Sequence, residues 1–449
     1  MRSISVLGAA ALLAVFPAAA HAQSTSQEVV VKESTTVVVK EAPKPSPVAF
    51  TPYGFFLFNA FFNDVAGSRN YPLPSACSAG AACEGNVLLD VRQTRLGSRL
   101  AFNDTAGWTG ATLSALVEVD FNGGYTGAVA TSSAGFYNPA IRLRKAYGDA
   151  AWGTESKLTL RIGQDDRLIS PLRPVSLAYV ANPLFQNAGL LHGRAPMIQV
   201  RWDLAPKDGL AVSAAAAALN PQENTAGDNG VSPSAAVDLG AGNRSRIPNL
   251  EGRVGLGLRS GGKNVAVLGG WAGWQKNRFV SPATETNVDV NSYIFGGDLT
   301  LNVAFLQVLG EIYKANGYDA PGSLGASQGV ALSFTRPTPT TFAISDAKAV
   351  PAFGGWFQVS ARPIEALQIY GGWGGTQSPF DAYTGSVFST SAATRAATRL
   401  QNFMWAAGVI GYAGKNWRFS AEYGRATSYF LSGLNYTQGQ FSLNSQLVF

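Results

Sequence analysis

The chain has 449 residues, of which 46% are hydrophobic and only 14% are charged, and its formal net charge at pH 7 is +6. This composition excludes an intrinsically disordered chain, and so few charges are a poor fit to a soluble helical protein, which needs a charged outer face. Two cysteines and two histidines are too few for zinc ribbons, haem clusters, multi-disulfide scaffolds or most histidine-based catalysis. With 50 glycines, 25 phenylalanines and 15 tyrosines, the composition favours an all-β chain.

Residues 1–22 have the features of a secretory signal peptide. Arg2 supplies the basic start, residues 7–16 form a short apolar run, and Ala20-His21-Ala22 is a small-x-small cleavage site. No later stretch of 18 apolar residues could form a transmembrane helix. We therefore expect an exported protein that no helix holds in a membrane.

Residues 23–50 differ in composition from the rest of the chain. The sequence Val-Val-Val-Lys-Glu occurs at 29–33 and again at 37–41, and three prolines follow at alternate positions from Pro43 to Pro47. Prolines at this density stiffen a chain into an extended linker. The segment is predicted to be a periplasmic arm, with a solvated leader as the alternative.

Cys77 and Cys83 are the only two cysteines, separated by Ser-Ala-Gly-Ala-Ala. In an exported protein such a short, flexible spacer predicts a small loop closed by a disulfide. A reactive thiol pair is the alternative, but no basic residue flanks the cysteines to lower a thiol pKa.

From residue 51 onward, segments of about ten residues alternate apolar and polar positions with period two. In 91–103, Leu96, Leu100 and Phe102 occupy one face, and arginine, glutamine and asparagine occupy the other. The pattern recurs at 157–166, 197–204 and 250–259. Such alternation predicts strands with one face toward an apolar medium and the other toward a polar interior.

Sixteen segments have this character. They are 52–63, 90–103, 109–122, 141–152, 157–165, 197–205, 210–220, 249–260, 264–277, 291–303, 306–318, 351–362, 366–377, 399–413, 417–430 and 440–449. The weakest is 210–220, because its run of alanines also has helix propensity.

The connections between these segments alternate strictly between a few residues and about ten to over thirty. Short turns at one end and long loops at the other are typical of outer-membrane barrels, which also need an even number of strands. A solenoid or propeller would need a fixed repeat, which is absent. We predict an all-β fold, a sixteen-stranded antiparallel transmembrane β-barrel over 51–449.

Aromatic residues at the strand ends favour a bilayer as the outer medium. Trp108, Trp152 and Trp417 lie at the short-turn ends of their segments, where an aromatic girdle would meet the lipid headgroups. The last strand alternates up to Phe449, the final residue. That ending resembles the terminal signal that the assembly machinery of outer-membrane barrels recognises, so Phe449 is the predicted assembly signal.

Several stretches between residues 85 and 205 carry a family resemblance. They are DVRQTRLG at 90–97, LSALVEVDF at 113–121, IRLRKAY at 141–147, RIGQD at 161–165 and GRAP at 193–196. They resemble the sixteen-stranded trimeric outer-membrane porins, most of all the DcaP-like family. The resemblance implies a homotrimer in the outer membrane of a Gram-negative bacterium.

The long connection 166–196 is the candidate constriction loop. It contains three prolines and His192, the only histidine after the signal peptide. In the porins that the chain resembles, the third loop folds into the barrel and narrows it. The residues assigned to this constriction are Asp165, Asp166, Arg167, Arg173, His192 and Arg194.

Arginine dominates the charges on the inward face of the strands. The candidate pore-lining, anion-binding residues are Arg95, Arg99, Arg142, Arg144, Arg161, Arg201, Arg253 and Arg259. In a water-filled lumen these side chains remain charged and attract anions. The alternative is that they form structural salt bridges with inward acids such as Glu118, Asp120, Asp203 and Glu251.

The sequence thus predicts a non-enzymatic porin for small hydrophilic solutes, with a preference for anions and dicarboxylates as one candidate class. The expected partners are outer-membrane lipids, the assembly machinery and two further copies of the chain; no cofactor, metal or nucleic acid is expected. A structural or adhesin-type barrel is one alternative. An outer-membrane hydrolase is another, since Gly325-Ala-Ser327-Gln-Gly329 matches a nucleophile-elbow pattern, with His192 as the histidine available to it.

Overall fold

The computed structural model describes residues 48–65, 71–74, 84–102, 110–123, 140–186, 188–221, 241–280, 287–318, 329–338, 341–383 and 392–449. Residues Ser46–Phe449 belong to one compact unit. The predicted signal peptide, nearly all of the arm, both cysteines and Trp108 lie outside the described residues, so what the sequence predicts for them stays a prediction.

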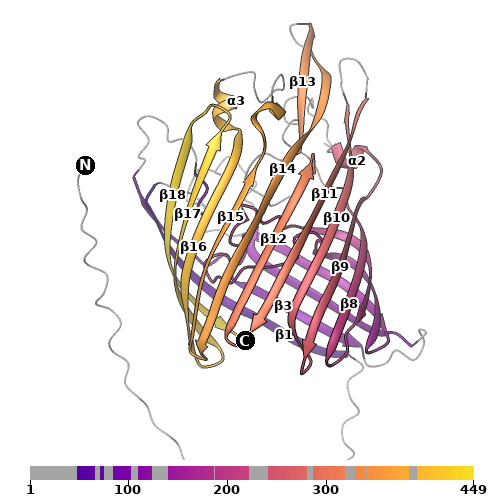
Figure 1. The fold of residues 1–449 in the computed structure, drawn as a ribbon, viewed down its shortest axis with the longest axis vertical. Helices are drawn as coiled ribbons and strands as arrows, with labels where there is room; N and C mark the ends of the chain where they lie inside the picture. Colours follow the sequence, from indigo (N-terminus) through magenta and orange to yellow (C-terminus); the bar gives the residue numbers. More distant parts are fainter. Residues whose placement is uncertain are drawn as a thin grey trace, which may run out of the picture. The chain divides into compact units, whose positions relative to one another are not determined.

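The described strands form one antiparallel sheet that closes on itself, because the first strand pairs with the last. They are β1 (Val48–Asn63), β2 (Asn86–Asp90), β3 (Arg95–Phe102), β4 (Thr112–Gly123), β5 (Ala140–Trp152), β6 (Ser156–Asp166), β7 (Arg194–Leu204), β8 (Gly209–Leu219), β9 (Asn249–Ser260), β10 (Lys263–Val280), β11 (Asn287–Val303), β12 (Leu306–Asn316), β13 (Gly329–Thr338), β14 (Thr341–Ile364), β15 (Leu367–Gln377), β16 (Arg399–Ala413), β17 (Trp417–Phe430) and β18 (Asn435–Val448). Figure 1 shows these strands as a tilted barrel wall.

The wall itself has sixteen strands, as the sequence predicts. β2 and β3 both pair with β1 and form one wall strand that is interrupted at 91–94. β13 pairs only with the loop-side half of β14, whereas β12 pairs with the remainder of β14. All sixteen predicted segments, including the alanine-rich 210–220, coincide with wall strands.

Helix is scarce in the described part of the chain: α2 (Ala241–Arg244), α3 (Ala392–Ala397) and the 3-10 turn η2 (Phe380–Tyr383) are each six residues or fewer. None of the described helices has the length and apolar character needed to cross a bilayer.

The alternation of the sequence places apolar residues on the outside of the barrel and polar residues inside. Ile162, Val200 and Leu256 are each about half exposed on the outer surface, whereas Glu118 and Glu251 are buried. A closed barrel satisfies all of its strand hydrogen bonds, and an apolar exterior requires lipid around it. The chain therefore forms a transmembrane β-barrel of the outer-membrane type.

Strand lengths differ around the barrel. β6, β7 and β8 have 11 residues each, whereas β10 has 18, β11 has 17 and β14 has 24. The extra length of β14 pairs with β13 in a hairpin that the sequence predicts as loop, and Figure 1 shows it beyond the ends of the neighbouring strands. One side of the wall is thus taller than the other.

The last strand closes the barrel tightly. The Phe449 N–H donates to the Gly54 carbonyl at 3.1 Å, and the Gly54 N–H donates to the Phe449 carbonyl at 3.2 Å. The Phe449 ring lies 5.5 Å from that of Phe56 between centroids. The predicted role of Phe449 in assembly stays a prediction, but the residue has a structural role at the seam.

Candidate functional site: a loop inside the barrel beside a charged wall

Residues 167–186 and 188–193, which belong to the connection between β6 and β7, lie inside the barrel and pack against its far wall. Leu177, Tyr179 and Phe185 from this lumen loop share a buried apolar cluster with Trp356 and Tyr370, which belong to β14 and β15. Phe185 stacks on Trp356 at 5.8 Å between ring centroids. The structure thus brings the loop into the lumen.

Three buried glutamates of the wall hold the lumen loop by accepting its hydrogen bonds. The first is Glu251 of β9, which accepts from Arg167 Nε at 2.6 Å and from the Leu168 N–H at 2.9 Å. Tyr318 also donates to this carboxylate at 3.0 Å. Arg167 and Glu251 are both fully buried, so the first residues of the loop are fixed by a charge-assisted contact.

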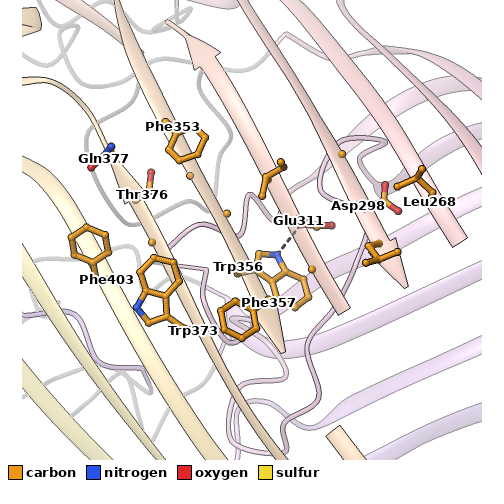
Figure 2. Close-up of a pocket in the computed structure, with 17 residues that line it drawn as sticks. Leu268, Asp298, Glu311, Phe353, Trp356, Phe357, Trp373, Thr376, Gln377 and Phe403 are labelled. Carbon is orange, nitrogen blue, oxygen red and sulfur yellow. Dashed lines mark hydrogen bonds between the residues drawn. The ribbon is translucent and has the colours of Figure 1, made fainter. Parts of the chain in front are cut away.

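Glu311 of β12 is the second anchor. Its carboxylate accepts hydrogen bonds from the Ser170 hydroxyl, from the Leu172 N–H at 2.7 Å and from the Trp356 indole at 2.8 Å. Figure 2 shows the bond between Glu311 and Trp356.

Glu422 of β17 is the third anchor and accepts the most donors. The Leu177 and Ala178 N–H groups donate to its Oε1 at 2.8 and 3.1 Å, and the hydroxyls of Ser176 and Tyr370 donate to its Oε2. Because one carboxylate can accept several hydrogen bonds at once, Glu422 can pair with two successive N–H groups of the loop backbone.

Two glutamines complete the attachment. Gln358 accepts from the Val175 N–H at 2.7 Å and donates to the Val175 carbonyl, and Gln93 accepts from the N–H groups of Val180 and Ala181. Residues 167–181 therefore form hydrogen bonds with inward side chains of several wall strands. These partners begin at Glu251 of β9 and end at Gln93, between β2 and β3. Hydrogen bonds to side chains of the wall thus hold the first half of the loop in place.

The boundaries of this loop differ slightly from the predicted 166–196. Asp165 and Asp166 are the last residues of β6, and Arg194 is the first residue of β7. Asp166 and Arg194 face each other in register. These three residues thus belong to the rim of the wall beside the loop, whereas Arg167, Arg173 and His192 lie within the loop.

A charged wall formed by β3 to β7 lies on the side of the lumen where the loop begins and ends. Its centre is a cluster of ion pairs in which Arg144 contacts both Glu118 and Asp120 at 2.8 Å, and Arg142 contacts Asp120 at 2.7 Å. Arg95 lies 3.5 Å from Glu118. These three arginines thus form salt bridges with inward acids, which is the alternative to unpaired pore-lining charges.

Lys145 and Asp149 belong to the same wall, although the sequence pattern does not indicate them. Lys145 contacts Asp165 and Asp166 at 2.7 and 2.8 Å, and Arg161 pairs with Asp149 at 2.7 Å and with Asp165. A bulge in the pairing of β4 with β5 falls next to Lys145. An extra residue shifts the following side chains to the other face of a strand, so period-two alternation fails here.

The rim carries the loop's own charges. Arg173 lies 3.5 Å from Asp166, and Arg194 lies 3.9 Å from the same carboxylate. Arg194 also donates to His192 Nε2 at 2.9 Å, so the imidazole accepts and is neutral. Burial, reinforced by the charges of Arg173 and Arg194, holds the pKa of His192 well below its ordinary value.

The remaining predicted arginines have separate surroundings. Arg99 lies over the ring of Tyr53, and Arg201 pairs with Asp203 at 2.7 Å. Arg253 pairs with Asp298 at 2.6 Å. Arg259 donates to the carbonyls of Ala205 and Gly262 near the short turns, away from the loop.

Cations outnumber acids on the charged wall and its rim. The cations are Arg95, Arg99, Arg142, Arg144, Lys145, Arg161, Arg173, Arg194 and Arg201. The acids paired with them are Glu118, Asp120, Asp149, Asp165, Asp166 and Asp203. Nine cations against six acids leave an excess of three positive charges in this set. Side chains of Arg142 and Arg173 are 28% and 31% exposed, so part of this charge reaches the solvent.

Metal binding and the nucleophile-elbow match concern other residues of the chain. The described residues contain no group of three histidine, cysteine or acidic side chains that could hold a metal ion. Ser327 of the nucleophile-elbow match lies outside the described residues, and the hydrogen bond described for His192 is to Arg194.

Comparisons with known proteins agree with the fold. No protein-family model and no curated protein sequence matches the chain. Among solved structures, the outer membrane channel DcaP of Acinetobacter baumannii matches with a TM-score of 0.64 and 14% identity, over 90% of this chain and 99% of that one. OmpF of Salmonella typhi, in complex with daunomycin, matches with a TM-score of 0.51 and 9% identity, over 89% of this chain and 97% of that one.

At these identities the comparisons establish the fold: the chain has the architecture of the outer-membrane porins, and the resemblance to the DcaP-like branch is confirmed at that level. The closed barrel, its apolar exterior and its short turns at one end place it in an outer membrane.

Proposed function

We propose that the protein is a passive diffusion channel for small hydrophilic solutes that favours anions. The observation that carries this proposal is the lumen loop, which is held against one wall by three glutamates while an excess of cations lies on the other side. The similarity in fold to DcaP, an outer membrane channel, supports the same function.

The electrostatic potential in the lumen depends on which charged side chains remain in contact with water. Glu251, Glu311 and Glu422 are nearly fully buried under the loop and are occupied by its donors. The cations that reach solvent act on solutes over about 8 Å at physiological salt. Each is worth about 1 kcal/mol or less in water, but several in one narrow passage give a selectivity of several-fold.

Planar-bilayer recording tests the proposal. The protein should form open, water-filled channels, and the reversal potential in a potassium chloride gradient should indicate anion preference. The double variant Arg142→Gln/Arg173→Gln should lower that preference, whereas Arg278→Gln/Lys415→Gln, which removes two cations outside the lumen loop and charged wall, should not. An absence of conductance would favour a structural or adhesin-type barrel, and cation preference in the unaltered protein would refute the electrostatic part.

A homotrimer is the proposed assembly, on the basis of the porin-like fold. The outer face of β18, β1 and β2 carries several exposed aromatic and branched side chains, including Phe56, Phe58, Phe62, Leu89 and Phe441. We assign the subunit contacts to this face. Cross-linking in detergent followed by denaturing gel electrophoresis should show a trimer, which Phe58→Arg should weaken.

A further inference from the structure

Two arginines on the inward face of the wall lie at the short-turn end of the lumen, apart from the charged wall and the lumen loop. Arg362 stands near the end of β14, and Arg418 is the second residue of β17. They share the faces of their strands that carry the buried Ser360 and Ser420. The strands from β14 to β17 are consecutive neighbours in the wall, as Figure 1 shows. The sequence pattern assigns neither arginine to a site.

The ring of Tyr412, on the strand β16 between them, brings the two guanidinium groups together. Arg362 Cζ lies 4.2 Å from the centroid of this ring, and Arg418 Cζ lies 5.7 Å from it. A guanidinium over an aromatic ring at such distances is attracted to it. Tyr412 is itself held in place, because its hydroxyl donates to Gln368 at 2.6 Å and its ring packs against the apolar cluster under the lumen loop. Two positive charges from separate strands therefore meet at one fixed ring.

Neither arginine forms an ion pair within the described ranges of the chain. After residue 350 the sequence contains only three acids, which are Glu365, Asp381 and Glu422. Glu422 accepts the donors of the lumen loop, and Asp381 belongs to η2 at the loop end of the barrel. Glu365 offers its backbone carbonyl to Arg362. In the described part of the chain the two guanidinium groups thus lack a carboxylate partner, unlike the arginines at the centre of the charged wall.

Both guanidinium groups keep N–H donors for a ligand. Arg362 donates Nε and Nη2 to the Glu365 carbonyl at 3.1 and 2.5 Å. Arg418 donates Nη1 to Gln446 Oε1 at 3.3 Å, and its Nε has no hydrogen-bond partner among the described residues. The donors of a guanidinium form a planar fork that matches the oxygens of a carboxylate or a phosphate. The pair thus offers both charge and geometry for an oxyanion.

The height of this pair in the barrel indicates where its ligand comes from. Arg418 stands four residues before Glu422, which holds the lumen loop. A rise of about 3.4 Å per residue on strands tilted by about 40° places Arg418 roughly 10 Å from that anchor, toward the short-turn end. Short turns face the periplasm in barrels of this type. On the proposed function, a solute that has passed the loop therefore meets this pair before it leaves the barrel.

We propose that Arg362 and Arg418, held by Tyr412, form a binding subsite for the oxyanion group, carboxylate or phosphate, of a solute at the periplasmic end of the lumen. The subsite rests on the proposed function as a channel that favours anions, and it adds a second binding position away from Arg142 and Arg173. A guanidinium forms two parallel hydrogen bonds with an oxyanion, which a monatomic ion such as chloride cannot match. The pair therefore retains organic oxyanions in preference to chloride.

Single-channel recording of the full chain in a planar bilayer tests this proposal, with citrate as the probe in potassium chloride solution. Citrate is added to one chamber at a time, and its half-blocking concentration is measured from each side. Arg362→Gln/Arg418→Gln should raise this concentration several-fold from one side, that of the short turns, and leave it unchanged from the other. Tyr412→Leu should have the same one-sided effect because it removes the ring, whereas Tyr412→Phe, which keeps the ring, should not.

A charge-matched control separates this pair from positive charge in general. Arg278→Gln/Lys415→Gln removes the same total charge, and Lys415 is exposed on the turn just before β17. This variant should behave like the unaltered protein. Unchanged block from both sides in Arg362→Gln/Arg418→Gln, or an equal change from both, would overturn the subsite while anion-favouring channels would leave the proposed function intact. An absence of open channels in the unaltered protein would refute both.

Discussion

Arg253 of β9 and Asp298 of β11 form an ion pair across the intervening strand β10, directly over Gly269. Their charged atoms lie 2.6 Å apart, and a Cβ at Gly269 would fall 2.3 Å from Asp298 Oδ2 and 2.5 Å from Arg253 Nη2. The absence of a side chain at this one position therefore allows two non-adjacent strands to pair. Asp298 is fully buried, so the contact matters for stability.

We predict that Gly269→Ala destabilises the barrel by displacing this ion pair. A buried carboxylate that loses part of its pairing costs about 1–3 kcal/mol. The temperature at which the folded band on a gel converts to the unfolded band should fall. Gly270→Ala is the control, because Gly270 is the next residue, faces outward and has only Val254 Cγ2 at 4.0 Å. Equal effects of the two changes would show that the ion pair contributes nothing.

Glu422→Gln should release the middle of the lumen loop. The carboxylate accepts the Leu177 and Ala178 N–H groups on one oxygen and the Ser176 and Tyr370 hydroxyls on the other, whereas the amide has a single acceptor oxygen and no charge. Hydrogen bonds to a charged group are worth about 1.5–3 kcal/mol each. We expect larger and noisier single-channel currents and faster hydrogen exchange over residues 176–178. Glu365→Gln, at the short turn between β14 and β15, should leave both measurements unchanged; unaltered exchange in Glu422→Gln would contradict the anchoring role.

The strands could be predicted from the sequence because each has an unbroken alternation of apolar and polar residues between short turns. The β13–β14 hairpin could not, because Pro337 and Pro339 look like loop breaks, yet Pro337 lies within β13, which pairs along β14 outside the ring of wall strands. The bulge beside Lys145 has no signature in the sequence either, so the alternation of apolar and polar residues does not indicate that Lys145 and Asp149 face the lumen.

The inward orientation of the glutamates that hold the loop follows the period-two pattern of the sequence. Glu311 lies on the same face of its strand as Leu309 and Tyr313, and Glu422 on the same face as Ser420, which is the inward face in both cases. What the alternation cannot give is the partner of an inward charge, because that depends on the path of a loop across the lumen. For this reason the sequence does not show that Arg142 and Arg144 form ion pairs with acidic residues instead of remaining unpaired in the lumen.

His192 should make the folded state sensitive to acid. Its pKa in the folded protein is depressed by burial and by Arg173 and Arg194, with Asp166 acting in the opposite direction, whereas an unfolded histidine titrates near 6.5. Below about pH 6.5 the unfolded chain therefore binds a proton that the folded chain does not, and stability falls as the pH falls. Denaturation midpoints at pH 7.5 and 5.5 should differ more for the unaltered protein than for His192→Gln, which keeps an acceptor for Arg194 but does not titrate. The same difference in both proteins would assign the acid sensitivity to other groups.

Arg173, predicted in the constriction loop, and Arg259, predicted to line the pore, should affect selectivity unequally, although each substitution removes one positive charge. Arg173 is about a third exposed on the lumen loop beside Asp166, so on the proposed function its charge acts on a solute in the lumen. Arg259 donates to the carbonyls of Ala205 and Gly262 at the short turns. Its charge therefore lies at the short-turn end of the barrel, away from the lumen loop. We expect Arg173→Gln to lower the anion-to-cation permeability ratio, measured from reversal potentials, while Arg259→Gln changes the ratio little and instead lowers the temperature of unfolding. If Arg259→Gln changed selectivity as much as Arg173→Gln, net charge rather than the position of charges at the loop would set the preference, because the two variants carry the same total charge.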